Sequence, residues 1–272
     1  MSKVLVTGTL GFIGKNLYKK LTESYSDVIR VEEDLFYTEG WQDKLQEQLK
    51  LANPDVVFHV GACSNTLESD TNYMMVRNYE STKILVDWCL AYNKPIVYSS
   101  SAASYGEEGQ HPSNLYGWSK YVAEGYVISN GGIALRYFNV YGPGEEHKGK
   151  MASIAYQMFT KHKSKQPIKL FPGKPTRDFV YVDDVVDANL HALENYEDLK
   201  GRFFDVGSGT SNSFELVMEY LEIPYGYVTE SEIPTSYQYY TCADNERMMK
   251  GWRPRYDLKA GIEKYKNYLD KA

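Results

Sequence analysis

The feature that most constrains the fold of this chain is a glycine-rich turn directly after a short apolar stretch near its start. Residues 4–6 (Val-Leu-Val) read as a strand, and glycines follow at Gly8, Gly11 and Gly14. This spacing permits a tight turn, a close backbone approach to a pyrophosphate, and close packing of the next helix on the sheet. The N-terminus of that helix offers N–H groups and a positive dipole end to phosphates. The turn therefore predicts a dinucleotide-binding βαβ unit.

Strands and helices alternate through the first half of the chain. Further strands are expected at 28–31, 56–58, 96–98 and 133–135, and helices at 12–21, 41–49, 73–92 and 116–128. Such alternation is typical of a parallel sheet, and it breaks into loops rich in glycine and proline after Arg136. We expect an α/β fold, a Rossmann doubly wound parallel sheet with a smaller C-terminal lobe. Residues 1–136 and part of 178–210 would bind NAD(P), and residues 137–177 and 211–272 would bind the substrate.

Composition excludes several classes of function. The chain has 272 residues, a net charge of −6 and a pI near 5.5, which argues against a nucleic-acid partner. No apolar run approaches the roughly 20 residues of a membrane span, and the start leaves no room for a signal peptide. Three scattered cysteines and five scattered histidines indicate free thiols in a reducing cytoplasm and no metal site.

Charged residues near the end of the second strand leave the choice of cofactor open. Glu32, Glu33 and Asp34 offer carboxylates to the hydroxyls of an adenosine ribose. Arg30 is instead a candidate partner for a 2′-phosphate. The first set favours NAD and the arginine favours NADP.

A tyrosine and a lysine four residues apart are the candidate catalytic pair. Tyr116 and Lys120 would lie on one face of a helix, where the ammonium is expected to lower the pKa of the phenol. Ser101 follows a buried strand, at the sheet edge where doubly wound folds bind ligands. A tyrosine–lysine pair alone is as often a solvated helix face, and such serines are usually turn formers. The order of glycine turn, serine and tyrosine–lysine helix is far more specific.

The chain resembles the extended short-chain dehydrogenase/reductase family over nearly its whole length. The stretches that carry the resemblance are 7–14, 58–62, 99–102, the Tyr116/Lys120 pair, 136–143 and 177–184. The resemblance implies that Tyr116 is the acid/base, that Lys120 binds the nicotinamide ribose, and that Ser101 hydrogen-bonds the reacting oxygen.

Within that family, residues 147–153 and 61–66, the latter followed by 73–75, resemble the ADP-glycero-manno-heptose 6-epimerases of bacterial surface-polysaccharide (lipopolysaccharide) synthesis. This resemblance implies a sugar carbon inverted through a transient ketone, with Lys148 as a second acid/base. It implies NADP as cofactor, with NAD possible, an ADP-heptose as substrate, and a homo-oligomer. The implied cofactor contacts are Gly8, Gly11, Phe12, Ile13, Gly14, Arg30, Asp34, Leu35, Gly61, Ala62, Cys63, Ser64, Asn78, Tyr116, Lys120 and Val140. The implied substrate contacts are Ser101, Asn139, Lys150, Gln157, Phe171, Arg177 and Tyr237.

The chain also departs from the heptose epimerases. The segment between the second strand and Val56 is short, and the lysines that would bind a 2′-phosphate have no clear match there. Lys150 stands where the family tends to have serine. The alternatives are therefore another nucleotide-sugar epimerase or reductase, such as a hexose 4-epimerase, or a non-catalytic dinucleotide sensor. Lys148 would otherwise be a surface lysine in a basic loop.

Overall fold

The computed structural model of the protein describes residues 3–106, 111–229 and 239–271. The chain divides into two compact units. The first, which we call the N-terminal unit, comprises Met1–Tyr137 and Val186–Phe204. The second, which we call the C-terminal unit, comprises Phe138–Val185 and Asp205–Ala272.

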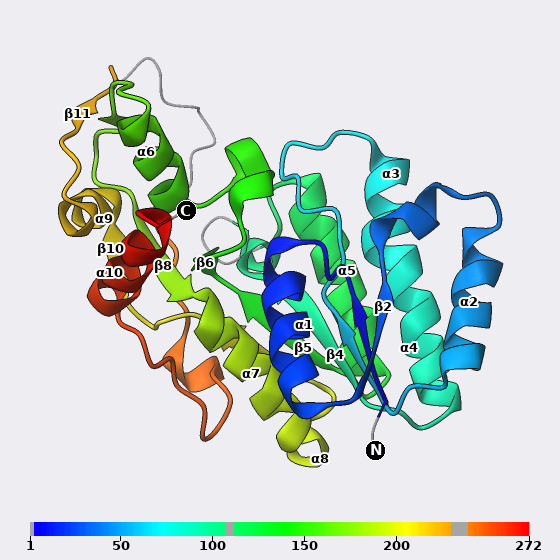
Figure 1. Cartoon of the computed structure of the whole chain (residues 1–272). Coiled ribbons are helices and arrows are strands. Elements are labelled where there is room, and N and C mark those ends of the chain that lie inside the picture. The colour runs from blue at the N-terminus through cyan, green and yellow to red at the C-terminus, as the bar shows by residue number, and fades with distance from the viewer. Residues whose placement is uncertain (1–2, 107–110, 230–238, 272) are drawn as a thin grey trace. The chain divides into compact units, whose positions relative to one another are not determined.

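A six-stranded sheet is the centre of the N-terminal unit (Figure 1). Its strands are β1 (Lys3–Thr7), β2 (Asp27–Val31), β3 (Val56–His59), β4 (Ile96–Ser101), β5 (Ile133–Tyr137) and β9 (Arg202–Val206), in the order β2-β1-β3-β4-β5-β9. The pairs β2–β1, β1–β3, β3–β4 and β4–β5 are all parallel. The direction of winding reverses between β1 and β3, the place where doubly wound sheets bind ligands beyond their strand ends. The predicted Rossmann architecture is confirmed.

Helices cover both faces of this sheet. They are α1 (Phe12–Ser24), α2 (Trp41–Ala52), α3 (Thr71–Met75), α4 (Ser81–Ala91), α5 (Leu115–Ser129) and α8 (Tyr196–Leu199), with short turns η1 (Glu33–Tyr37) and η3 (Ala102–Tyr105). A hydrophobic core joins α2, α4 and α5 to the sheet through Leu45, Leu85 and Val127, and α1 lies on the opposite face (Figure 1). The single helix expected at 73–92 is instead α3 and α4 joined by a π-helical turn, η2 (Val76–Glu80).

The C-terminal unit is built on smaller sheets. Its strands are β6 (Asn139–Tyr141), β7 (Lys169–Leu170), β8 (Thr176–Tyr181), β10 (Ser211–Ser213) and β11 (Gly226–Tyr227), and its helices and turns are η4 (Glu146–Met151), α6 (Ile154–Lys163), α9 (Phe214–Leu221), η6 (Asn245–Arg247) and α10 (Leu258–Leu269); α7 (Val182–Glu194) has residues in both units. The sheets have the orders β10-β8-β6 and β11-β7.

Buried tyrosines form much of the core of the C-terminal unit. The ring of Tyr141 lies 5.5 Å from that of Tyr181 and 6.2 Å from that of Tyr265, centroid to centroid. Gly261 of α10 faces this cluster, because a Cβ there would overlap the hydroxyl of Tyr141. Part of the chain's high tyrosine content is thus explained by packing. In either unit, none of the helices in the described ranges has the length and apolarity needed to cross a bilayer.

Candidate active site

The glycine turn follows β1 and packs against the loop after β3. Gly8 has φ +69°, and a Cβ on it would lie 2.5 Å from the Cα of Gly61 in the loop after β3. A Cβ on Gly14 would overlap the carbonyl oxygen of Gly8, so α1 packs directly on the turn. Gly11 is the N-cap of α1 and contributes no side-chain cap. The cradle is therefore lined by backbone at the start of a helix, as pyrophosphate binding requires.

A chain of buried polar contacts through Thr7, His59 and Thr82 adjoins this cradle. Thr7 Oγ1 accepts a hydrogen bond from Gly61 N (2.8 Å) and lies 2.8 Å from His59 Nδ1. The other ring nitrogen of His59 is 2.8 Å from Thr82 Oγ1 of α4. Burial, with a smaller effect from Lys120, lowers the pKa of His59 to about 3, so the imidazole is neutral. His59 is thus a packed histidine that ties β1 and β3 to α4.

Glu32, the residue after β2, reaches back to the glycine turn. Its carboxylate accepts hydrogen bonds from the Thr9 hydroxyl and from Leu10 N (3.3 Å). Arg30 is exposed, and its guanidinium lies 5.5 Å from the ring of Tyr18 on α1. A carboxylate, rather than the arginine, is therefore bonded to the turn.

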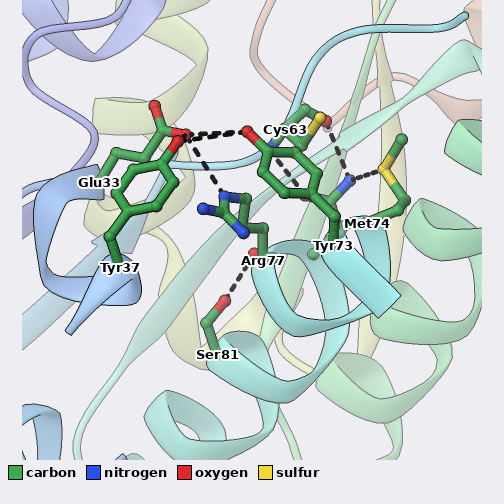
Figure 2. A network of polar contacts seen from close by, with 8 residues as sticks. Glu33, Tyr37, Cys63, Tyr73, Met74, Arg77 and Ser81 are labelled. Carbon is green, nitrogen blue, oxygen red and sulfur yellow. Dashed lines mark hydrogen bonds and ion pairs between the residues drawn. The ribbon is translucent and has the colours of Figure 1, made fainter. Parts of the chain in front are cut away.

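Glu33 and Tyr37, which follow β2, contact Arg77 of the π-helical turn (Figure 2). The Arg77 guanidinium lies between the rings of Tyr73 and Tyr37, 3.6 Å and 4.4 Å from their centroids. Its Nε is 3.4 Å from the carboxylate of Glu33. Asp34 is exposed, whereas Leu35 is buried in the core.

Asn78, in the π-helical turn, holds the loop after β3. Its side chain accepts a hydrogen bond from Cys63 N (2.7 Å) and donates to Cys63 O (3.0 Å) and Ser119 Oγ (2.9 Å). Ser119 in turn donates to the carbonyl of Tyr116 (2.7 Å). Asn78 thereby links the loop of Gly61, Ala62, Cys63 and Ser64 to α5, a link that the sequence did not predict. A π-helical turn is often found at functional sites, but no residue pattern in this chain predicts one.

Tyr116, Lys120 and Ser101 lie in the N-terminal unit as expected, on α5 and at the end of β4. Lys120 Nζ donates to the carbonyl of Ser99 (2.6 Å), and burial lowers its pKa to about 7. Burial raises the pKa of Tyr116, and a hydrogen bond with Ser101 only partly offsets this. The pKa of this phenol is therefore raised, not lowered as expected, because burial disfavours the phenolate.

The second lysine candidate lies in the C-terminal unit, on η4. Lys148 is half-buried, and burial lowers its pKa while Glu145 acts in the opposite direction. Gly149 interrupts the turn with φ +53°. Lys150 is exposed, and its carbonyl accepts a hydrogen bond from Gln157 Nε2 (3.2 Å). These substrate candidates therefore adjoin one another within that unit.

The other substrate candidates of the C-terminal unit are more scattered. Asn139 on β6 accepts a hydrogen bond from Thr241 (3.3 Å), and Phe171 follows β7. Val140, expected to contact the cofactor, also lies on β6 in this unit. Arg177 on β8 is buried, donates to Thr176 O (2.9 Å), and lies 5.7 Å from the ring of Phe214.

The carboxylate of Asp178 accepts hydrogen bonds from the backbone N–H groups of Ser208, Gly209 and Ala243. Tyr237 lies outside the described residues. Within the described part of the chain, no three His, Cys, Asp or Glu side chains are grouped to hold a metal ion.

Comparison with known proteins places this geometry in a family. The profile of the NAD dependent epimerase/dehydratase family matches residues 4–207. An ADP-L-glycero-D-manno-heptose-6-epimerase of Brachyspira hyodysenteriae is 32% identical, over 99% of this chain and 98% of the relative. The crystal structure of the Helicobacter pylori ADP-L-glycero-D-manno-heptose-6-epimerase superposes with a TM-score of 0.85 at 25% identity, covering 100% of this chain and 97% of that one.

A UDP-glucose 4-epimerase of Thermotoga maritima has a similar fold, with a TM-score of 0.83 at 24% identity, covering 99% of each chain. The family profile spans the glycine turn, the strand-end serine and the tyrosine–lysine helix together. By this match and by its architecture, the chain belongs to the NAD dependent epimerase/dehydratase family of enzymes.

Proposed function

We propose that this enzyme is a nucleotide-sugar epimerase that inverts carbon 6 of an ADP-glycero-manno-heptose through a transient ketone. The observation that carries the proposal is the placement of Ser101, Tyr116 and buried Lys120 around the end of β4, two strands from the glycine cradle. The heptose is proposed because the Brachyspira relative carries that activity in its name and matches almost the full chain.

The cofactor we infer is NAD, in preference to the NADP that the sequence resemblance favours. Glu32 directs its carboxylate to the glycine turn, where an acidic residue after the second strand accepts hydrogen bonds from a ribose 2′-hydroxyl. A 2′-phosphate at that place would be repelled. Arg30, the proposed partner of a 2′-phosphate, stacks instead over Tyr18.

The proposed mechanism assigns a separate task to each side chain. Bound NAD would supply the hydride acceptor for oxidation of the alcohol and the hydride donor for reduction of the ketone. Tyr116 and Lys148 serve as the two acid/base groups, one removing the alcohol proton and the other returning a proton to the carbonyl oxygen. Ser101 hydrogen-bonds the reacting oxygen, and Lys120 holds the nicotinamide ribose and keeps positive charge near Tyr116.

The remaining assignments follow the two units. We propose that the N-terminal unit holds the cofactor through the glycine turn, the 61–64 loop and Asn78, and that the C-terminal unit holds the nucleotide sugar through Asn139, Lys150, Gln157, Phe171, Arg177 and Tyr237. Arginine suits a diphosphate because its planar donors match phosphate oxygens. We also propose a cytoplasmic homo-oligomer; the three cysteines are free thiols, as a reducing compartment favours.

The test is a stereochemical assay. Purified protein is incubated with ADP-D-glycero-D-manno-heptose without added cofactor, and the products are resolved by NMR. We expect the L-glycero isomer to form, and to disappear in Tyr116→Phe. Turnover of a UDP- or GDP-hexose, with no conversion of the heptose even after NAD or NADP is supplied, would overturn the substrate and leave the family assignment intact.

A further inference from the structure

One face of α5 carries a third ionisable residue beyond the catalytic pair. Tyr116, Lys120 and Glu124 follow one another at intervals of four residues, so their side chains lie along one side of the helix. Lys120 and Glu124 are only 3% and 2% exposed. A buried carboxylate next to a buried catalytic lysine needs partners, since an isolated buried charge is strongly unfavourable.

Both carboxylate oxygens of Glu124 are engaged. Oε1 accepts from Arg136 Nη2 (2.5 Å), and Oε2 accepts from Arg136 Nε (2.8 Å) and from Ser100 Oγ (2.6 Å). The Arg136 guanidinium lies 3.8 Å from the ring centroid of Phe203 and 4.2 Å from that of Tyr105. A bidentate pair packed between two rings has a fixed geometry.

This ion pair also contacts the end of β4 through Ser100. The three consecutive serines there have different partners. The Ser99 carbonyl accepts from Lys120, and the Ser99 hydroxyl lies 2.9 Å from the Tyr137 hydroxyl. Ser100 is bonded to Glu124, and Ser101 follows as the N-cap of η3. Glu124 therefore fixes the strand residue that directly precedes Ser101.

The charges around Lys120 show what Glu124 contributes electrostatically. His59 on β3 is neutral, Tyr98 on β4 presents its ring 4.8 Å from Lys120 Nζ, and burial raises the pKa of the Cys63 thiol in the loop after β3. Tyr116, on the same helix, has a raised pKa and is neutral.

Glu124 is thus the carboxylate one helical turn from Lys120 on α5, and it is paired with Arg136 of β5. Burial, the largest effect, lowers the pKa of Lys120, whereas Cys63 and, after it, Glu124 raise it. A buried ion pair is weak evidence for stability, because desolvation offsets its attraction. Its effect on the neighbouring lysine is a better reason for its presence.

We propose that Glu124, held by Arg136, is a positioning residue for catalysis: it keeps Lys120 protonated and fixes Ser100, and through it Ser101, against α5. The proposal rests on the catalytic roles proposed for Tyr116 and Lys120, and it does not depend on which sugar is turned over.

The decisive measurement is the pKa of Lys120 in the folded protein, followed by NMR of 13Cε-labelled lysine and assigned by its loss in Lys120→Arg. Glu124→Gln keeps the side chain's size and its bond to Ser100 but removes the charge. We expect it to lower the Lys120 pKa by about one unit. The alkaline limb of the kcat profile should move to lower pH by the same amount.

Three further variants make the test specific. Glu124→Asp, which restores the charge, should restore the pKa of Lys120. Glu124→Gln combined with Arg136→Met, which leaves no unpaired charge, should lower it less than Glu124→Gln alone and covers the case in which the single variant does not fold. Asp87→Asn removes a carboxylate from the exposed Lys83–Asp87 pair of α4 and should change nothing.

An unchanged Lys120 pKa in folded Glu124→Gln would overturn the proposal, and so would an equal shift in Asp87→Asn. Because the NMR titration needs no substrate, its outcome is separate from that of the heptose assay. A protein that fails to convert the heptose but shows the expected titration would lose the proposed substrate and keep the role of Glu124.

Discussion

The two regions that carry the proposed acid/base groups are built very differently. In the N-terminal unit, Lys120 lies on a regular helix, is 3% exposed, and is bonded to a strand carbonyl. In the C-terminal unit, Lys148 lies on a short turn that Gly149 interrupts. The first region has its side chains fixed by packing and hydrogen bonds, whereas the second depends on an irregular backbone. The comparison teaches that chemistry needing a fixed direction is placed on regular elements.

The largest expected effect comes from the rigid region. Tyr116→Phe removes the hydroxyl proposed to exchange protons with the substrate and should lower kcat by about 10²–10⁴-fold, as loss of a general acid/base does. Cofactor binding, measured by fluorescence titration, should persist. Tyr121→Phe, on the exposed side of the same helix, is the matched control. Nearly full activity of Tyr116→Phe would show that the N-terminal unit does not supply this acid/base group.

The irregular region should give a smaller and different loss. With Tyr116 taken as the group that removes the alcohol proton, Lys148→Met should slow net inversion by about 10²-fold but leave the first oxidation step intact, so that reduced nicotinamide accumulates and is seen by its fluorescence. Lys163→Met, a change on the exposed surface of α6, serves as control. Full inversion by Lys148→Met would show that this residue is only a surface lysine.

The dependence of the unfolding free energy on pH tests whether buried His59 stays neutral in the folded N-terminal unit. The pKa of His59 is about 3 in the fold against an ordinary value of 6.5, so the unfolded state takes up a proton first as pH falls. The stability linked to this residue is complete above 6.5 and is lost as the pH falls toward 3. His59→Gln should reduce the slope of unfolding free energy against pH by about 1.4 kcal/mol per unit in that window.

Urea unfolding at several pH values measures this slope, and exposed His162→Gln is the control. An identical slope in His59→Gln and the unmodified protein would show that the imidazole can be protonated without unfolding.

The smallest expected effect concerns the edge of the N-terminal unit, where Glu32 bonds to the glycine turn. Glu32→Ser should narrow the preference for NAD over NADP by about tenfold, equivalent to about 1.4 kcal/mol, because the repulsion of a 2′-phosphate is removed. Calorimetric titration of both cofactors gives the ratio, with exposed Glu39→Gln as control. If the unmodified protein binds NADP more tightly than NAD, Arg30 is the better assignment.

Most of the N-terminal unit was predictable because its signals are local. Alternating apolar runs identify the strands, the glycine spacing identifies the turn, and a four-residue interval places Tyr116 and Lys120 on one face. The helix expected at 73–92 was placed correctly but its π-helical turn was not. A single widened turn leaves the hydrophobic pattern almost unchanged, so periodicity does not reveal it.

The sequence by itself determined the Rossmann class, the glycine turn and the placement of Tyr116 and Lys120 on one helix, because each depends on residues close together in the chain. Only the tertiary structure showed that Glu32 bonds to the turn, that Asn78 bonds to Cys63, and that Arg136 pairs with Glu124. It also reversed the expected pKa shift of Tyr116. These features depend on burial and on contacts between residues distant in sequence, and desolvation and hydrogen bonding act only once the fold brings those groups together.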